Sequence, residues 1–202
     1  MELKIKPLDT AFEAAKHFVQ TVITPPLEQV GGLLADKVKS WRLNNQINIV
    51  TKAENLLKER GVKTKKVSLK VMAPLLEECS LEDDEDLQQK WAALLANTVA
   101  EGSAVKTNIF TNTLKEMTAE DAEIFQAIFE HCTISTPTER GIEVTHSRRA
   151  ISPDAFKDYP DIDLIFDNLK RLRLIREIAT HGSDRVPVVV SELGLKFMAA
   201  CS

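Results

Sequence analysis

Apolar residues recur at every third or fourth position through most of this chain, which is the spacing of amphipathic helices. The spacing predicts a first helix over Leu8–Val22. Pro25 and Pro26 end it, because proline has no N–H and disfavours helix in the residue before it. A longer helix is predicted from Leu27 to Gly61, since glycine is a common helix terminator. The first part of the chain is therefore expected to be helical.

Two further helices are predicted before Gly102, which is expected to end the second of them. The first covers Ser68–Cys79. The second begins with Ser80 as its expected N-cap and with an acidic first turn, Glu82–Glu85, where negative charge meets the positive end of the helix dipole. One face of this helix carries four large apolar residues: Leu87, Trp91, Leu94 and Leu95.

Shorter elements follow in the second half of the chain. A helix is predicted over Thr107–Met117. Thr118 with Asp121 three residues later resembles a capping box, which predicts the start of the next helix. Polar and apolar residues then alternate around Ile142, as in a short strand.

The last part of the chain has the element order of a winged-helix domain. Ser152 and Pro153 fit the cap and the first position of one helix, and Asp161 fits the start of another. The pattern then predicts a strand, a turn at 181–184, a second strand through Val190 and a closing helix.

These elements predict a mainly α protein of two domains. A helical N-terminal bundle is expected over residues 1–102. A winged-helix-like domain with a small antiparallel β-ribbon is expected over residues 103–202.

Composition and charge indicate a globular cytoplasmic protein. The chain has 202 residues, of which 44% are hydrophobic and 28% charged, and its formal net charge is −4. An acidic balance argues against a whole surface built to neutralise phosphates. No apolar run is long enough to span a membrane as a helix. The cysteines are odd in number, widely spaced and preceded by no signal peptide, which favours buried free thiols in a reducing cytosol: Cys79, Cys132 and Cys201.

The four histidines lack the spacing of a metal site, so no metal ion and no cofactor are expected. The acidic run Glu82–Asp86 carries the carboxylates that a hard cation prefers, but helix-start electrostatics is the favoured interpretation. Between Lys58 and Lys70 there are six basic residues and one acid, interpreted as a solvated surface.

Four sequence blocks in order resemble the bacterial Abi-alpha (abortive infection alpha) family over most of residues 25–132. They are PPLEQVGGLLADKVKSWRLNNQINI, KAENLLKERGV, VSLKVMAPLLEECSLEDDEDLQQKWAALLAN and EMTAEDAEIFQAIF. The positions that carry the pattern are Gly32, Trp41, Arg42, Asn45, Gln46, Trp91, Leu95, Ala96 and Asn97. The resemblance implies a mostly helical bacterial protein from mobile or defence-associated gene neighbourhoods. It implies no assigned catalytic residue.

Two groups of residues are candidates for binding. The first lies on the long helix: Trp41, Arg42, Asn45 and Gln46. Its polar residues could bind a ligand or a partner, but hydrogen bonding to a neighbouring helix inside the fold, such as the acidic helix, is the favoured interpretation. The second would line the third helix and the wing, where winged-helix proteins hold DNA: Lys170, Arg171, Arg173, Arg176 and Arg185. Acids close to the second group in sequence cancel its charge, which favours a protein-contacting or structural wing over DNA contact.

Two toxic activities each have a signal in the sequence, and each signal has a simpler interpretation. The pairs Arg176/His181 and Arg140/His146 have the Arg-x4-6-His spacing of HEPN ribonucleases, but neither pair is predicted on a helix, so chance is favoured. The helix Leu27–Trp41 could lie on a membrane, although an ordinary core helix is the favoured interpretation.

The function that the sequence favours is that of a non-enzymatic, phage-defence-associated protein of the Abi-alpha type. It would act in the cytoplasm through macromolecular binding, with a protein partner or self-association expected. The first alternative is a winged-helix DNA-binding regulator, and the second is an effector that cleaves RNA or damages membranes.

Overall fold

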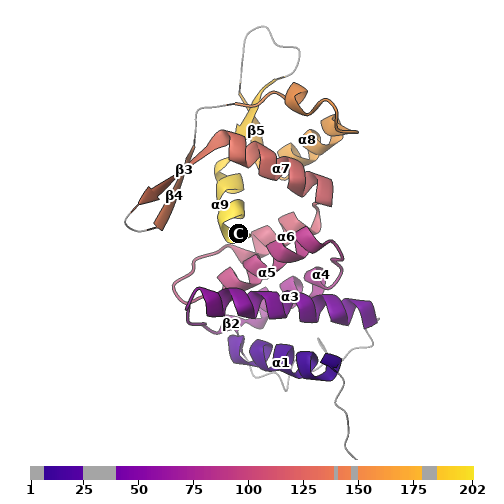
Figure 1. Ribbon diagram of the computed structural model, residues 1–202, viewed down its shortest axis with the longest axis vertical. Helices are drawn as coiled ribbons and strands as arrows, with labels where there is room; N and C mark the ends of the chain where they lie inside the picture. The colour runs from indigo at the N-terminus through magenta and orange to yellow at the C-terminus, as the bar shows by residue number, and fades with distance from the viewer. Residues whose placement is uncertain (1–6, 25–39, 139–140, 147–149, 179–185) are drawn as a thin grey trace, which may run out of the picture. The chain divides into compact units, whose positions relative to one another are not determined.

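A computed structural model describes residues 7–24, 40–138, 141–146, 150–178 and 186–202 (Figure 1). Contacts within the chain divide it into two compact units. The first unit comprises the chain up to Glu116 together with Ala200–Ser202, and the second comprises Met117–Ala199. The fold is mainly helical with a small antiparallel sheet near the C-terminus, which confirms the expected fold class. The assignment of 1–102 and 103–202 as separate domains stays a prediction.

The first unit consists of helices and one very short parallel strand pair. In chain order the elements are α1 (Pro7–Val22), β1 (Ile23–Thr24), α3 (Ser40–Glu59), β2 (Val67–Ser68), α4 (Leu69–Cys79), α5 (Glu85–Val99) and α6 (Thr107–Lys115). Strands β1 and β2 pair in parallel. Helix α1 lies alongside α3 in Figure 1 and ends before Pro25 and Pro26, as expected. The predicted helix from Leu27 to Lys39, with Gly32, lies outside the described residues.

Helix α5 forms the centre of the first unit. It packs against α3, α4 and α6. The four residues predicted on its inner face are buried, and so are Ala92, Ala93 and Ala96 on its other sides. Residues 91–96 are apolar and buried on every side, as expected for a helix segment with neighbours on several sides.

The start of α5 differs from the sequence prediction, because Asp84 and not Ser80 is its N-cap. The Asp84 carboxylate accepts hydrogen bonds from the backbone N–H groups of Asp86 (3.0 Å) and Leu87 (2.9 Å). Ser80 is the C-cap of α4 instead. Helix α4 persists to Cys79 and is followed by one further turn, so the extended backbone that an N-cap requires is reached only at Asp84.

Glycine follows the end of α5 but does not terminate it directly. Helix α5 ends at Val99, and Ala100 donates its N–H to the Ala96 carbonyl. Gly102 lies in the next turn with a φ of +78°, a left-handed conformation that favours glycine. Helix α6 then begins at Thr107 as expected and ends at Lys115, two residues earlier than predicted.

The second unit combines helices with two antiparallel hairpins. Its elements are α7 (Ala119–Cys132), β3 (Thr133–Thr138), β4 (Gly141–His146), the 3-10 helix η2 (Pro153–Phe156), α8 (Ile162–Arg171), β5 (Ile175–Glu177), β6 (Val188–Val190) and α9 (Glu192–Ala200). The strand expected around Ile142 is β4, and it pairs with β3, which was not predicted.

Two predicted helix starts in the second unit are confirmed. Thr118 N–H donates to an Asp121 carboxylate oxygen (2.9 Å), and Asp121 N–H donates to Thr118 Oγ1 (3.2 Å), which is a reciprocal capping box. Ser152 Oγ accepts from the Asp154 N–H (3.3 Å) at the start of η2. Each of these helix starts is stabilised by hydrogen bonds between residues two or three positions apart. Such local pairs can be recognised in a sequence.

The predicted ribbon near the C-terminus is formed by β5 and β6. Ile175 is opposite Val190, and Ile151 pairs with Val188 on the other edge of β6 through two backbone hydrogen bonds of 2.9 Å. The predicted turn at 181–184 lies outside the described residues.

Helix α9 closes the second unit against α7 and the ribbon. The Phe125 and Phe197 rings lie 6.0 Å apart between centroids. Gly194 allows α9 to approach the chain before β5, because a Cβ atom there would lie 2.2 Å from the Leu174 carbonyl oxygen. Glycine is needed at this position because any side chain would collide with the neighbouring backbone, and not because of its own backbone conformation.

Candidate functional site

The candidate residues on α3 bond to the C-terminal end of α4. Arg42 donates from Nε (3.0 Å) and Nη2 (2.9 Å) to Ser80 Oγ, and Asn45 Nδ2 donates to the Ser80 carbonyl oxygen (3.4 Å). Gln46 Nε2 donates to the Leu76 carbonyl oxygen (2.7 Å). The last carbonyls of a helix lack partners inside the helix, so α3 supplies donors to them. Trp41 lies in α3, and its side chain is outside the described residues.

The same network reaches the acidic segment before α5. Gln88 Nε2 donates to the Glu82 carbonyl oxygen (3.0 Å) and lies 3.5 Å from Asn45 Oδ1. Lys52 on α3 forms a salt bridge with Glu85 (2.6 Å). Hydrogen bonding inside the fold thus engages the Asn45 side-chain amide and two nitrogens of the Arg42 guanidinium. A role for the α3 residues in binding a partner stays a prediction.

The acidic run serves the start of α5. Asp84 caps the helix, Glu85 pairs with Lys52, and Glu82 accepts from the Asp84 N–H (3.1 Å). Burial raises the pKa of Glu82, while hydrogen bonds from the Asp84 backbone and the Trp91 side chain offset part of that rise. Within the described ranges, no group of three or more His, Cys, Asp or Glu side chains is placed to hold a metal ion.

The pattern positions of α5 are buried or hydrogen-bonded inside the fold, and their assignment as structural residues stays a prediction. Trp91, Leu95 and Ala96 are buried. Asn97 Nδ2 donates to the Ala200 carbonyl oxygen (2.9 Å), and Asn97 Oδ1 accepts from Arg60 Nη1 (3.0 Å). Asn97 therefore connects the end of α3 to the last residues of the chain.

The C-terminal residues are held in the first unit by the same group of contacts. Arg60 Nη2 donates to the Ser202 carbonyl oxygen (3.0 Å), and Cys201 is buried. Burial raises the pKa of the Cys201 thiol well above its ordinary value, and burial does the same for Cys79 and Cys132. The three thiols are therefore protonated at neutral pH, which fits the expectation of buried free cysteines.

The basic candidates of the second unit lie around the end of α8. Lys170 pairs with Asp167 (2.8 Å) and Glu177 (3.0 Å), and these two carboxylates raise its pKa. Arg171 donates twice to Asn168 Oδ1, at 3.1 and 2.7 Å.

The other basic candidates follow in sequence. Arg173 has a φ of +61° just after α8, and Arg176 is exposed on β5. Arg185 lies outside the described residues. The structure thus brings Lys170 and Arg171 together at one helix end, with the Lys170 charge matched by two acids.

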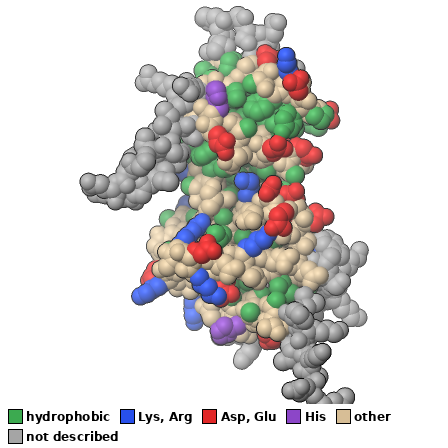
Figure 2. All heavy atoms as spheres, viewed as in Figure 1, with side chains coloured by type: hydrophobic (Ala, Val, Ile, Leu, Met, Phe, Trp, Pro, Cys, Tyr) green, Lys and Arg blue, Asp and Glu red, His purple; other side chains and the backbone are tan. Residues whose placement is uncertain are grey.

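The outer face of α8 combines acidic and apolar side chains. Asp163, Asp167 and Arg171 are exposed, and Leu164 between them is 70% exposed. In Figure 2 acidic and hydrophobic side chains lie together over the region that Figure 1 labels α7 and α8. Leu164 falls outside the helical stripe of buried residues, Ile162, Ile165, Phe166 and Leu169. The position of Leu164 outside this stripe is the feature of the sequence that predicts its exposure.

The two Arg–His pairs have no helical setting in the described structure. Arg176 lies on β5 and His146 ends β4, while His181 and Arg140 are outside the described residues.

The family model described as abortive infection alpha matches residues 44–201. The chain belongs to the abortive infection alpha family. The Abi-alpha match covers Asn45 and Gln46 on α3, the pattern positions of α5 and the basic candidates around α8, and it runs through the β5–β6 ribbon. It therefore extends well beyond the blocks that first suggested Abi-alpha. Gly32, Trp41 and Arg42 precede the matched range.

The other comparisons add no relative of this Abi-alpha chain. Neither the comparison with curated proteins nor that with solved structures gave a match. Within the described residues, none of the helices is both long and apolar enough to cross a membrane.

Proposed function

We propose that this Abi-alpha chain acts in phage defence as a non-enzymatic cytoplasmic protein that binds a protein partner through the outer face of α8. The observation that carries the proposal is Leu164, whose side chain is 70% exposed in the middle of that face. Protein interfaces combine an apolar centre with a polar rim, and Leu164 with its acidic neighbours has that arrangement.

The charges around Leu164 favour a partner with a basic rim. Asp163 and Asp167 lie beside it on α8, and Glu177 follows on β5. Lys170 forms salt bridges with two of these acids, so it adds little positive field. An apolar pocket flanked by Lys or Arg on the partner would complement this surface, whereas DNA phosphates would be repelled by its carboxylates.

A DNA-binding regulator is the second candidate, and the order of elements in the second unit supports it. Helix α7, the pairing of Ile151 with β6, then η2, α8 and the β5–β6 ribbon follow the order of a winged-helix domain. Exposed Arg173 and Arg176 lie next to α8, where such domains contact DNA.

Phage challenge of bacteria that express the chain tests the leading proposal. The native chain should reduce plaque numbers while infected hosts die, and Leu164→Asp should restore plaques because a buried carboxylate disfavours the contact. Leu81→Asp is the matched control, since Leu81 is also exposed (51%) but lies in the first unit.

Three other outcomes would oppose protein binding by α8. Equal plaque reduction by native and Leu164→Asp chains would contradict it. Salt-dependent duplex binding that is lost when Arg171 and Arg173 become Glu would favour the DNA regulator. Loss of host killing in His181→Ala alone would favour RNA cleavage.

A further inference from the structure

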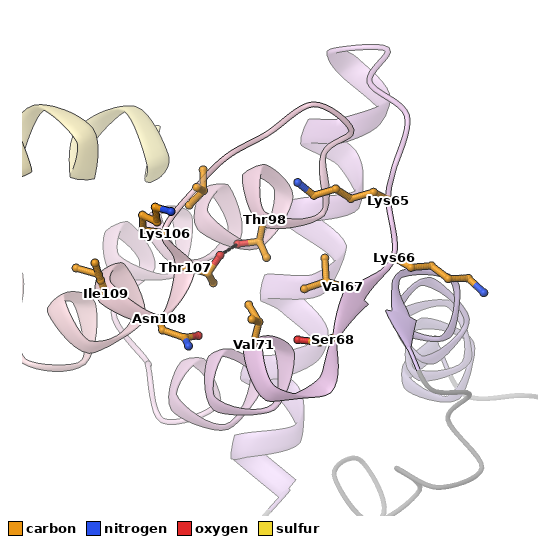
Figure 3. A pocket seen from close by; sticks show the side chains of 11 residues that line it. Lys65, Lys66, Val67, Ser68, Val71, Thr98, Lys106, Thr107, Asn108 and Ile109 are labelled. Carbon is orange, nitrogen blue, oxygen red and sulfur yellow. Dashed lines mark hydrogen bonds between the residues drawn. The ribbon is translucent and has the colours of Figure 1, made fainter.

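The first unit contains a pocket of about 460 Å³ beside the starts of α4 and α6, here called the α4–α6 pocket (Figure 3). It is lined by Lys65, Lys66, Val67, Ser68, Val71, Thr98, Val105, Lys106, Thr107, Asn108 and Ile109. Its volume falls within the range of roughly 300–1,000 Å³ that small-molecule sites occupy.

The charge of the α4–α6 pocket is opposite to that of the whole chain. Three of its eleven lining residues are lysines and none is acidic, although the chain has a net charge of −4. Figure 3 shows Lys65 and Lys106 on either side of the Thr98–Thr107 pair, while the Lys66 ammonium points away. Lys65 Nζ donates to the Ser103 carbonyl oxygen and retains further N–H donors. The pocket therefore favours an anion.

Two helices begin at the α4–α6 pocket without the usual compensation for their N–H groups. Ser68 is the N-cap of α4 and Lys106 is the N-cap of α6, and neither makes a side-chain capping hydrogen bond. Neither helix has an acid in its first turn. The positive end of each dipole adds to the lysine charges, which is the arrangement that binds phosphate groups.

Apolar side chains line the rest of the pocket. Val67 and Val71 lie below the threonine pair in Figure 3, and Ile109 is 49% exposed although it lines the pocket. Such surfaces bind the flat faces of aromatic rings. A ligand with both an anionic group and a ring would contact both kinds of surface.

The threonine pair can also bind a sugar hydroxyl. Thr98 Oγ1 lies 2.7 Å from the Leu94 carbonyl oxygen, to which it donates, so Thr107 donates to Thr98 across their 2.9 Å contact. The lone pairs of Thr107 Oγ1 then stay available to a hydroxyl donor in the pocket.

We propose that the α4–α6 pocket binds a nucleoside phosphate. The phosphate lies between Lys65 and Lys106 at the start of α6, and the base packs against Val67 and Val71. The pocket belongs to the first unit only, so this proposal is independent of the α8 face.

Titration calorimetry on the full chain tests the proposal, with AMP, GMP, CMP, adenosine and inorganic phosphate as probes. At least one nucleotide should bind saturably, and at least about tenfold more tightly than adenosine or phosphate. Lys106→Glu should weaken nucleotide binding by about tenfold or more, since it reverses a charge at the phosphate. Val71→Phe should weaken it by filling the base site. Lys16→Glu is the control, because it makes the same charge change on α1.

Several results would overturn this assignment. The first is the absence of saturable binding by any nucleotide at millimolar concentration. The second is unchanged affinity in both Lys106→Glu and Val71→Phe when circular dichroism shows native helicity. Equal affinity for a nucleotide and for inorganic phosphate would overturn the nucleoside part of the proposal.

Discussion

At the scale of single residues, Ser80 shows how one side chain can serve a tertiary contact in place of a local one. Its hydroxyl accepts from Arg42 and donates to the Glu77 carbonyl oxygen (2.6 Å), and Ser80 is fully buried. A serine before an acidic run has the local pattern of an N-cap. Arg42 on α3, 38 residues earlier in the chain, hydrogen-bonds to this hydroxyl, so Ser80 makes a tertiary contact and is not an N-cap.

Glu82 provides a prediction for the pH dependence of stability. Burial raises its pKa above the ordinary 4.5, so the folded chain binds a proton more readily than the unfolded chain. The free energy of unfolding therefore falls as pH rises from about 4.5 through the higher folded-state pKa. Glu82→Gln keeps an acceptor for its hydrogen-bond donors and should remove this part of the pH dependence.

Urea unfolding at pH values between 4 and 7 measures the Glu82 effect. Glu101→Gln is the control, because Glu101 is exposed and the variant makes the same change of side chain outside this segment. If Glu82→Gln and native chains show the same slope of stability against pH, the half-buried Glu82 carboxyl is not the cause.

At the scale of elements, the closest approach in the second unit depends on Gly194. A Cβ atom there would lie 2.2 Å from the Leu174 carbonyl oxygen and 2.9 Å from Val190 Cγ1. Because the first of these contacts is with backbone, Gly194→Ala should shift α9 and lower the free energy of unfolding by about 1–3 kcal/mol. Thermal unfolding followed by circular dichroism measures the loss.

The matched control for Gly194→Ala is Gly61→Ala. Gly61 has open space around its Cβ position but a φ of +61°, so it tests backbone strain without a steric clash. A smaller loss for Gly194→Ala than for Gly61→Ala would contradict the steric account.

Elements with local signals could be predicted from the sequence, and those that depend on distant partners could not. The stripe of Ile162, Ile165 and Phe166 is a local signal, and it predicted α8. Thr118 and Asp121 are only three residues apart, and their capping box predicted the start of α7. Strand β3 depends on its pairing with β4. The α4–α6 pocket depends on residues from separate parts of the chain, such as Lys65 and Thr98. Lys65 and Lys66 were expected on a solvated surface, because the spacing of basic residues does not show which of them line a pocket with Lys106.

At the scale of the whole molecule, Asn97 joins parts of the chain that are far apart in sequence. Its side chain contacts Arg60 and Ala200. Asn97→Ala removes both hydrogen bonds and should lower the free energy of unfolding by about 1–2 kcal/mol. Urea unfolding of the full chain measures the change.

Asn55→Ala is the control for the Asn97 variant, because Asn55 is exposed on α3 and the same replacement there raises helix propensity. Equal stability of the Asn97→Ala and native chains would show that these contacts contribute nothing to the fold.

The placement of Ala200–Ser202 has a consequence for synthesis. Ribosomes release a chain from its N-terminus, yet the first unit needs residues that follow the whole of the second unit. Cys201 and the acceptor for Asn97 reach it only after some eighty intervening residues have been translated. Both units therefore reach their final packing only after residues near Ala200 have been translated, since the second unit itself ends at Ala199. Until then part of the apolar interior of the first unit is uncovered, which is when chaperones bind nascent proteins.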